Sequence, residues 1–154
     1  MNVTLRRPTP DEYAAWSVQE LEGYIDEIVA SGGLSRAVAE EQARREDAEV
    51  LPQGLDTPGQ LIFRLDVENQ PVGWLSLQHP LGDVGVGFIY NIEVDETFRG
   101  RGYGREAMRL AEEEAKRYGL RALALNVFGH NKVARGLYLS LGYRETSIRM
   151  KKDL

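Results

Sequence analysis

The chain contains no cysteine and no long apolar run, and each absence excludes a class of protein. Without cysteine among its 154 residues it has no disulfide framework, thiolate metal site or cysteine nucleophile. No run of about 18 apolar residues is present to span a membrane. Residues 1–8 also lack the apolar core of a signal peptide. We therefore expect a cytoplasmic protein that needs no metal and does not associate with a membrane.

Acidic residues outnumber basic ones, and the formal net charge is −5 at pH 7. A general nucleic-acid binder needs a basic surface that neutralises many phosphates, and no such surface is evident. At 154 residues the chain is long enough for one domain with a proper core, and we expect residues 1–154 to form it.

Hydrophobic periodicity, capping residues and turn residues predict an alternation of strands and helices. The expected helices are Pro10–Ala30, Ser35–Val50, Tyr103–Tyr118 and Asn131–Leu141. The expected strands are Val3–Arg7, a hairpin within Gln60–Gln78, Val84–Val94, Leu120–Val127 and Tyr143–Lys151, with a loop at Pro80–Asp83. The order β-α-α-β-β-β-α-β-α-β indicates an α+β fold with a mixed, twisted sheet flanked by helices.

A glycine-rich turn joins the strand that ends at Val94 to the helix that starts at Tyr103. Residues 99–104 read Arg-Gly-Arg-Gly-Tyr-Gly. The first N–H groups of a helix have no partner within the helix and carry the positive end of its dipole, so such a turn binds anions. Glycines let the backbone approach phosphate oxygens, and Arg99, Arg101 and Arg105 can add charge-assisted hydrogen bonds. The turn predicts a phosphorylated ligand.

Three phosphate-binding signatures compete for this turn. The nucleotide P-loop, G-x-x-x-x-G-K-[ST], occurs nowhere in the chain. The dinucleotide fingerprint fits Gly102, Gly104 and Ala107, but the strand over residues 122–127 lacks the acid expected for the ribose hydroxyl. A dinucleotide-dependent oxidoreductase is therefore a weaker alternative. The third signature, [QR]-x-x-G-x-[GA], matches Arg99, Gly102 and Gly104.

This third signature resembles the coenzyme A pyrophosphate loop of the GNAT acyltransferase superfamily. A second pattern supports it: Asn131-x-x-Ala134-x-x-Leu137-Tyr138-x-x-x-Gly142-Tyr143 is similar to the family's N-x-x-A-x-x-L-Y-x-x-x-G-F segment. The resemblance covers Phe88–Tyr143 in detail and the remainder in the order of elements. It implies the GNAT fold and an N-acetyltransferase that uses acetyl-CoA as acyl donor.

The resemblance also implies which residues hold the donor. In the family the pantetheine arm enters between the strands that match Phe88–Val94 and Leu120–Val127 and pairs with strand backbone, as in strand addition. One of those N–H groups would face the thioester oxygen. The implied coenzyme contacts are Ile92, Glu93, Val94, Arg99, Gly100, Arg101, Gly102, Tyr103, Gly104, Arg105, Asn131 and Tyr138. Asn131 is equally suited to cap the helix that follows it.

Two side chains are candidates for proton transfer. Tyr138 matches the tyrosine that acts as general acid in many family members, and a phenol suits reprotonation of a thiolate; alternatively it packs on the sheet. Ribosomal-protein N-terminal acetyltransferases carry a glutamate where this chain has Asn126, so that base is absent here. Glu93 is the remaining carboxylate, on the strand face opposite Ile92 and Val94. It is either the base, acting through a water, or an exposed residue or a partner for Arg101.

The acceptor is expected to be a small-molecule or peptide amine. The first 50 residues hold 11 Asp and Glu against 5 Arg, in helices that shape the acceptor side in the superfamily. That bias suits a cationic acceptor such as a polyamine, an aminoglycoside or a lysine, although solvated helix faces explain it equally well. Dimers are common in the family, so a homodimer is an open alternative to a monomer. The competing functional class is a non-catalytic acyl-CoA-binding regulatory or sensing domain.

Overall fold

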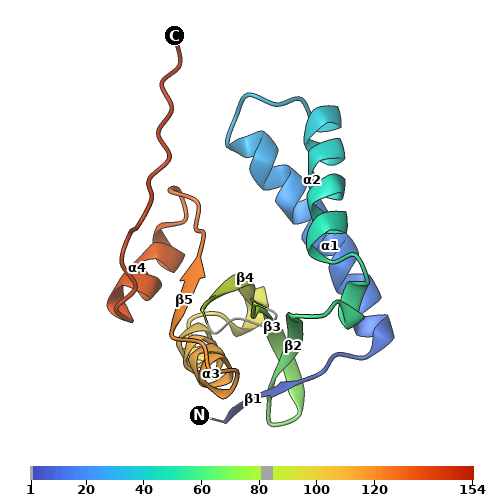
Figure 1. The fold of residues 1–154 in the computed structure, drawn as a ribbon, viewed down its shortest axis with the longest axis vertical. Helices are drawn as coiled ribbons and strands as arrows, with labels where there is room; N and C mark the ends of the chain where they lie inside the picture. The colour runs from blue at the N-terminus through green and yellow to red at the C-terminus, as the bar shows by residue number, and fades with distance from the viewer. Residues whose placement is uncertain (1, 81–84) are drawn as a thin grey trace. The chain divides into compact units, whose positions relative to one another are not determined.

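The computed structural model describes residues 2–80 and 85–154 and contains the expected alternation of elements (Figure 1). The helices are α1 (Pro10–Ala30), α2 (Arg36–Val50), α3 (Tyr103–Arg117) and α4 (Lys132–Ser140), with short 3-10 helices η1 (Gly54–Asp56) and η2 (Glu96–Phe98). The strands are β1 (Val3–Arg6), β2 (Gln60–Val67), β3 (Gln70–Gln78), β4 (Val86–Val94) and β5 (Ala122–Leu125). The chain forms two compact units, one ending at Ala124 and one spanning Leu125–Leu154.

The strands form one five-stranded sheet in the order β1-β2-β3-β4-β5. The first three pairings are antiparallel, and α3 connects β4 to β5, so the sheet is mixed. The β2–β3 hairpin turns through Glu68 and Asn69, which have φ angles of 51° and 66°. Two successive positive φ values are the mark of a type I′ turn, whose twist matches the strands.

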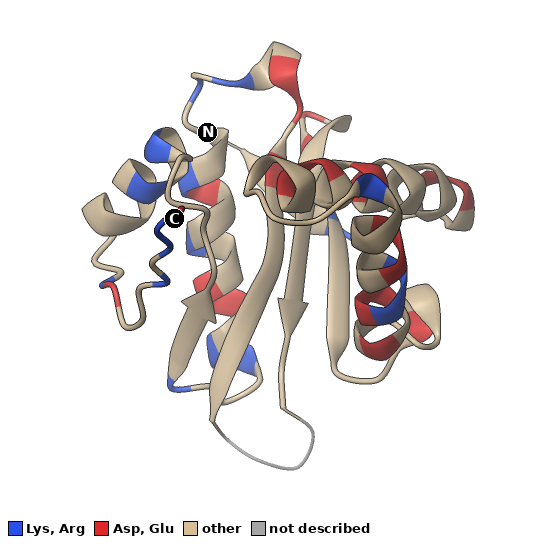
Figure 2. Ribbon diagram, turned by 90° about the horizontal axis from the view of Figure 1, so that it is seen from above, with Lys and Arg blue, Asp and Glu red and all other residues tan. Residues whose placement is uncertain are grey.

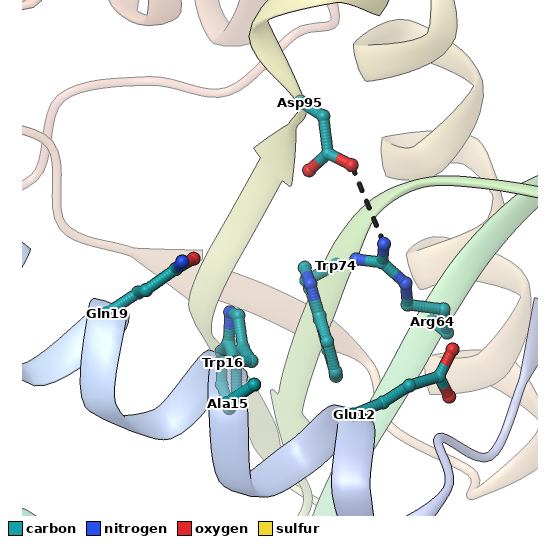
Figure 3. A pocket seen from close by; sticks show the side chains of 7 residues that line it. All are labelled: Glu12, Ala15, Trp16, Gln19, Arg64, Trp74 and Asp95. Atoms are coloured by element: carbon teal, nitrogen blue, oxygen red, sulfur yellow. Dashed lines mark ion pairs between the residues drawn. The ribbon is translucent and has the colours of Figure 1, made fainter.

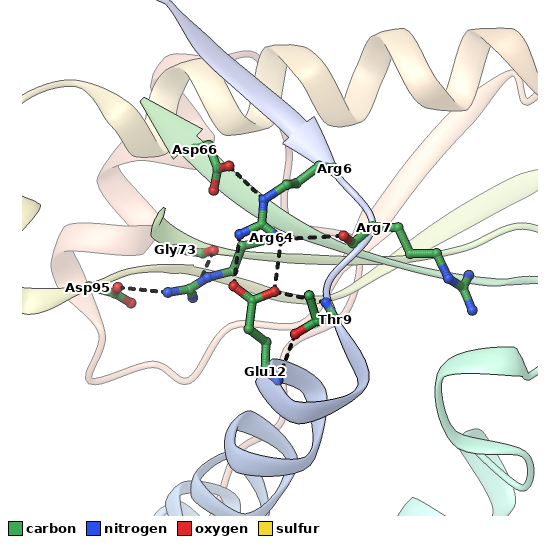
Figure 4. A network of polar contacts seen from close by, with 8 residues as sticks. All are labelled: Arg6, Arg7, Thr9, Glu12, Arg64, Asp66, Gly73 and Asp95. Atoms are coloured by element: carbon green, nitrogen blue, oxygen red, sulfur yellow. Dashed lines mark hydrogen bonds and ion pairs between the residues drawn. The ribbon is translucent and has the colours of Figure 1, made fainter. Parts of the chain in front are cut away.

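The start of α1 is fixed by a capping box formed by Thr9 and Glu12. The Thr9 hydroxyl accepts from the Glu12 N–H at 3.2 Å, and Glu12 accepts in return from the Thr9 N–H at 2.8 Å. Arg6 on β1 donates both terminal guanidinium nitrogens to the same Glu12 carboxylate and its Nε to Asp66 on β2 (Figure 4). The first turn of α1 is therefore tied to two strands, and the Arg6 contacts lower the pKa of Glu12 to about 2.

Both helix-packing surfaces of α1 are apolar. Toward the sheet, Trp16 stacks on Trp74 of β3 with ring centroids 4.7 Å apart and planes 17° apart. Toward α2, Ile25 and Ile28 pack with Ala39 and Ala43. Among the apolar residues of α1, Trp16, Ile25 and Ile28 are buried and Tyr13 and Leu21 half-buried, whereas Val29 is exposed. The Trp16–Trp74 stack sets which α1 residues lie over β4.

The final strand predicted over Tyr143–Lys151 is wrong for this structure, in which residues 143–154 are in no strand. Ile148 and Met150, the alternating apolar residues of this segment, are 64% and 85% exposed. Alternation indicates an extended backbone, but a strand also needs a neighbour to satisfy its N–H and C=O groups. Residues 81–84, which include most of the predicted Pro80–Asp83 loop and Val84, lie outside the described residues. Among those that are described, no helix is both long and apolar enough to cross a membrane.

Candidate acyl-transfer site

The glycine-rich turn has the backbone conformation that its sequence predicts. Gly100 and Gly102 have φ angles of 75° and 83°, which L side chains rarely adopt, and Gly102 is the N-cap of α3. The first intrahelical bond runs from the Glu106 N–H to the Gly102 carbonyl at 3.2 Å. The N–H groups of Tyr103 and Gly104, which precede it, lie outside this ladder. The turn and the helix start have the geometry of an anion-binding cradle.

Two of the arginines brace the turn. Arg99 Nε donates to the Val94 carbonyl at 2.9 Å, which ties the turn to the end of β4. Arg101 donates to the Thr97 carbonyl at 3.3 Å, and its guanidinium lies 5.6 Å from the Phe98 ring centroid. Arg101 therefore pairs with η2, and the alternative that Glu93 is its partner is not realised. Both guanidinium groups keep further N–H donors for a ligand.

The end of β4 extends past its neighbour on the β5 side. Arg121, just before β5, donates its N–H to the Gly85 carbonyl just before β4. The two strands run parallel and start level, but β4 has nine residues and β5 has four. Ile92, Glu93 and Val94 are half-buried and pair with β3 on the other side. Because β5 is the shorter strand, the end of β4 extends beyond it in the described part of the chain, and such an extended edge suits strand addition by an amide-bearing ligand.

A pair of carboxylates lies over β4, and sequence reasoning identified only one of them. Asn91 Nδ2 on β4 donates to Glu20 Oε1 on α1 at 2.7 Å, across 71 residues of sequence. Burial, and next the charge of Glu93, raise the pKa of Glu20 to about 7 from an ordinary 4.5. The sequence signal was the i, i+4 spacing of Trp16 and Glu20, which puts Glu20 one turn beyond a sheet-facing residue.

A cavity of about 320 Å³ lies between α1 and the sheet (Figure 3). Its lining joins the stacked Trp16 and Trp74 to polar groups, and the complete set is Glu12, Ala15, Trp16, Gln19, Arg64, Trp74 and Asp95. The Arg64 guanidinium lies 4.6 Å from the Trp74 ring centroid and pairs with Asp95 at 3.5 Å. The cavity therefore has an aromatic wall and charged groups at its rim, as small-molecule sites often do.

The second unit contains the other two predicted site residues. Asn131 caps α4, because its side chain accepts from the Ala134 N–H at 3.2 Å, which fulfils the capping role. Tyr138 is half-buried on α4 beside Tyr143, with ring centroids 6.2 Å apart, and burial raises the pKa of its phenol. Its hydroxyl is therefore held protonated at neutral pH, as a proton donor must be.

Comparison with known proteins matches residues 19–143 to the model of the Acetyltransferase (GNAT) family. Two relatives from Bacillus subtilis are named uncharacterized N-acetyltransferases. YycN is 31% identical over the whole of both chains, and YdgE is 31% identical over all of this chain and 99% of its own. The crystal structure of YycN superposes with a TM-score of 0.92, covering 99% of each chain.

A more distant structural neighbour shows the same fold with coenzyme bound to it. The aminoglycoside N-acetyltransferase AAC(6')-Iy in complex with CoA has a TM-score of 0.59 and 15% identity, covering 99% of this chain and 95% of that one. The glycine-rich turn before α3 and the extended end of β4 are consistent with the family match. The chain therefore belongs to the GNAT family of acetyltransferases.

Proposed function

We propose that the chain, acting as one domain over residues 1–154, transfers an acetyl group from acetyl-CoA to a primary amine by direct attack. The observation that carries this proposal is the turn at α3, where two glycines with positive φ lead into an open helix N-terminus after β4. That geometry suits a pyrophosphate group, and the family match supports coenzyme A as the ligand that contains it.

Each candidate residue has a role in this scheme. Gly100, Gly102 and the first N–H groups of α3 hold the pyrophosphate, while the backbone of Ile92 and Val94 pairs with the pantetheine amides. Tyr138 donates the proton to the departing sulfur, and the β4 carboxylate Glu93 serves the proton route from the amine. Their support is the two sequence patterns together with the protonated state of Tyr138 and the half-buried position of Glu93.

Cofactor binding is tested by thermal unfolding with and without acetyl-CoA. A ligand that binds only the folded state stabilises it by about 2.7 kcal/mol at a hundredfold excess over its dissociation constant. Gly102→Val should abolish the rise in melting temperature, because a branched side chain fills the cradle. Gly33→Val is the matched control, since Gly33 also has a positive φ, 95°, with nothing within 4 Å of an added Cβ. A wild-type chain that does not respond to millimolar acetyl-CoA would refute the proposal.

Turnover is tested by following thiol release from acetyl-CoA against a panel of amines, including polyamines, aminoglycosides and peptides. Release that depends on one class of amine supports an enzyme and identifies its acceptor. Cofactor binding without release for any amine would instead support a non-catalytic acyl-CoA-binding domain. NADP in place of acetyl-CoA in the unfolding assay tests the oxidoreductase alternative, which requires a shift with NADP.

A further inference from the structure

The structure places a second carboxylate opposite the one on β4. Trp16 stacks on Trp74, and Trp74 is the cross-strand neighbour of Glu93. Glu20 follows Trp16 by one helical turn on the same face of α1, so it lies over β4 beside Glu93. The hydrogen bond from Asn91 holds one Glu20 oxygen at 2.7 Å and leaves the other for a second partner.

We propose that Glu20 takes the proton from the incoming amine, with Asn91 as its positioning residue and Glu93 as the charge that tunes it; this rests on the proposed acetyl transfer. The acceptor class that fits is an amine that is cationic in solution. An ammonium group can lie against two facing carboxylates, whereas an anionic acceptor would be repelled by them.

The charged surroundings of Glu20 support this role. Glu93 faces it from β4, and from β3 the neighbours of Asn91 and Glu93 are the uncharged Ser76 and Trp74. Arg64, which stacks on Trp74, is ion-paired with Asp95. Within the described residues no ion pair involves Glu20 or Glu93. The charge of Glu93 therefore disfavours the ionised form of Glu20, and no neutralising cation is paired with either carboxylate in the described part of the chain.

Two protons leave the amine nitrogen during the transfer. Ionised Glu20 takes one proton from the ammonium and frees the nitrogen lone pair. The nitrogen then bonds to the acyl carbon, and the carbon–sulfur bond breaks with its electron pair on sulfur. The second nitrogen proton restores the acid that protonates the sulfur, which is Tyr138 in the proposed scheme. A base whose pKa is raised to about 7 is half-ionised at neutral pH, close to the value at which general bases work best.

The first test is the pH dependence of kcat/KM with the amine that the panel identifies. For the wild type we expect kcat/KM to rise with pH, with the midpoint of the rise near pH 7. Glu20→Gln keeps an acceptor for the Asn91 hydrogen bond but cannot take a proton. It should lower kcat/KM by about 10²–10⁴ at pH 7, and the loss should shrink above pH 9 where more amine is already free. Glu93→Gln should move the wild-type rise to lower pH, because it removes the charge that disfavours ionised Glu20.

The control variant is Glu22→Gln, on the same helix but paired with Arg36 at the surface, which should leave the profile unchanged. A second test needs no acceptor: carbon-13 NMR of labelled glutamate carboxyls should show one group that titrates near pH 7 and disappears in Glu20→Gln. An active wild type with an unchanged Glu20→Gln profile, or a Glu20 carboxyl that titrates near 4.5, would overturn this inference alone. A wild type inactive toward every amine would overturn the proposed function and this role with it.

Discussion

Replacing Glu20 by glutamine should stabilise the folded protein at alkaline pH but not at acidic pH. In the folded state the pKa of Glu20 is about 7, and in the unfolded chain it returns to about 4.5. Between these values the folded protein binds the extra proton, so its stability falls as pH rises from 4.5 to 7. Glutamine mimics the protonated acid at every pH and removes this dependence.

The size of the effect follows from the two pKa values. At 1.36 kcal/mol for each pH unit, their difference corresponds to about 3 kcal/mol, and partial solvent access lowers the expected gain at pH 8 to about 1–3 kcal/mol. With an m-value of about 2 kcal/mol/M in urea, the midpoint should rise by about 0.5–1.5 M.

Urea titrations at pH 5 and pH 8 would measure this, with tryptophan fluorescence as the signal because Trp16 and Trp74 are stacked in the core. Glu22→Gln is again the control. Equal midpoint changes at the two pH values, or a lower midpoint for Glu20→Gln at pH 8, would refute the reasoning that Glu20 is held as an acid by its surroundings.

Two further substitutions test the scaffold and the proposed acid. Gly73→Ala should destabilise the fold by about 1–3 kcal/mol, because its Cβ would lie 2.1 Å from the Glu93 carbonyl oxygen. Gly23→Ala, in the middle of α1 with nothing within 4 Å of an added Cβ, should be neutral or stabilising. Urea midpoints of the two variants measure the difference. Tyr138→Phe should change the affinity for acetyl-CoA, measured by thermal shift, by no more than a few fold, but it should lower turnover by about 10²–10⁴. Tyr143→Phe is the control and should keep turnover. Undiminished thiol release by Tyr138→Phe would assign that ring to packing.

Most of the fold could be predicted because its signals are local. The Thr9 capping box, the turn at residues 68–69 and the glycines before α3 each fix the backbone through neighbours only a few residues away. The helices and the first five strands accordingly fall within a few residues of their expected bounds. The prediction of a strand after Tyr143 failed because strand pairing depends on a neighbouring strand that the alternating pattern does not specify.

The candidate site likewise has a part that could be predicted from the sequence and a part that could not. The turn at residues 99–104 and Glu93 are readable from motifs, since each belongs to a continuous stretch of chain. Glu20 was one acidic residue among many on a solvated helix, and its environment depends on how α1 registers against β4. That register is set by a tryptophan stack between residues 58 positions apart, which a single sequence does not show.

The two ends of α1 are held by different contacts. Its first turn is held by Arg6 and the capping box, whereas its far half packs through Ile25 and Ile28 against the small residues Ala39 and Ala43 of α2. Local opening of α2 would expose this cluster and leave the stacked tryptophans and the sheet intact. The amides of α2 should thus exchange with solvent through partial opening, without loosening the carboxylates over β4.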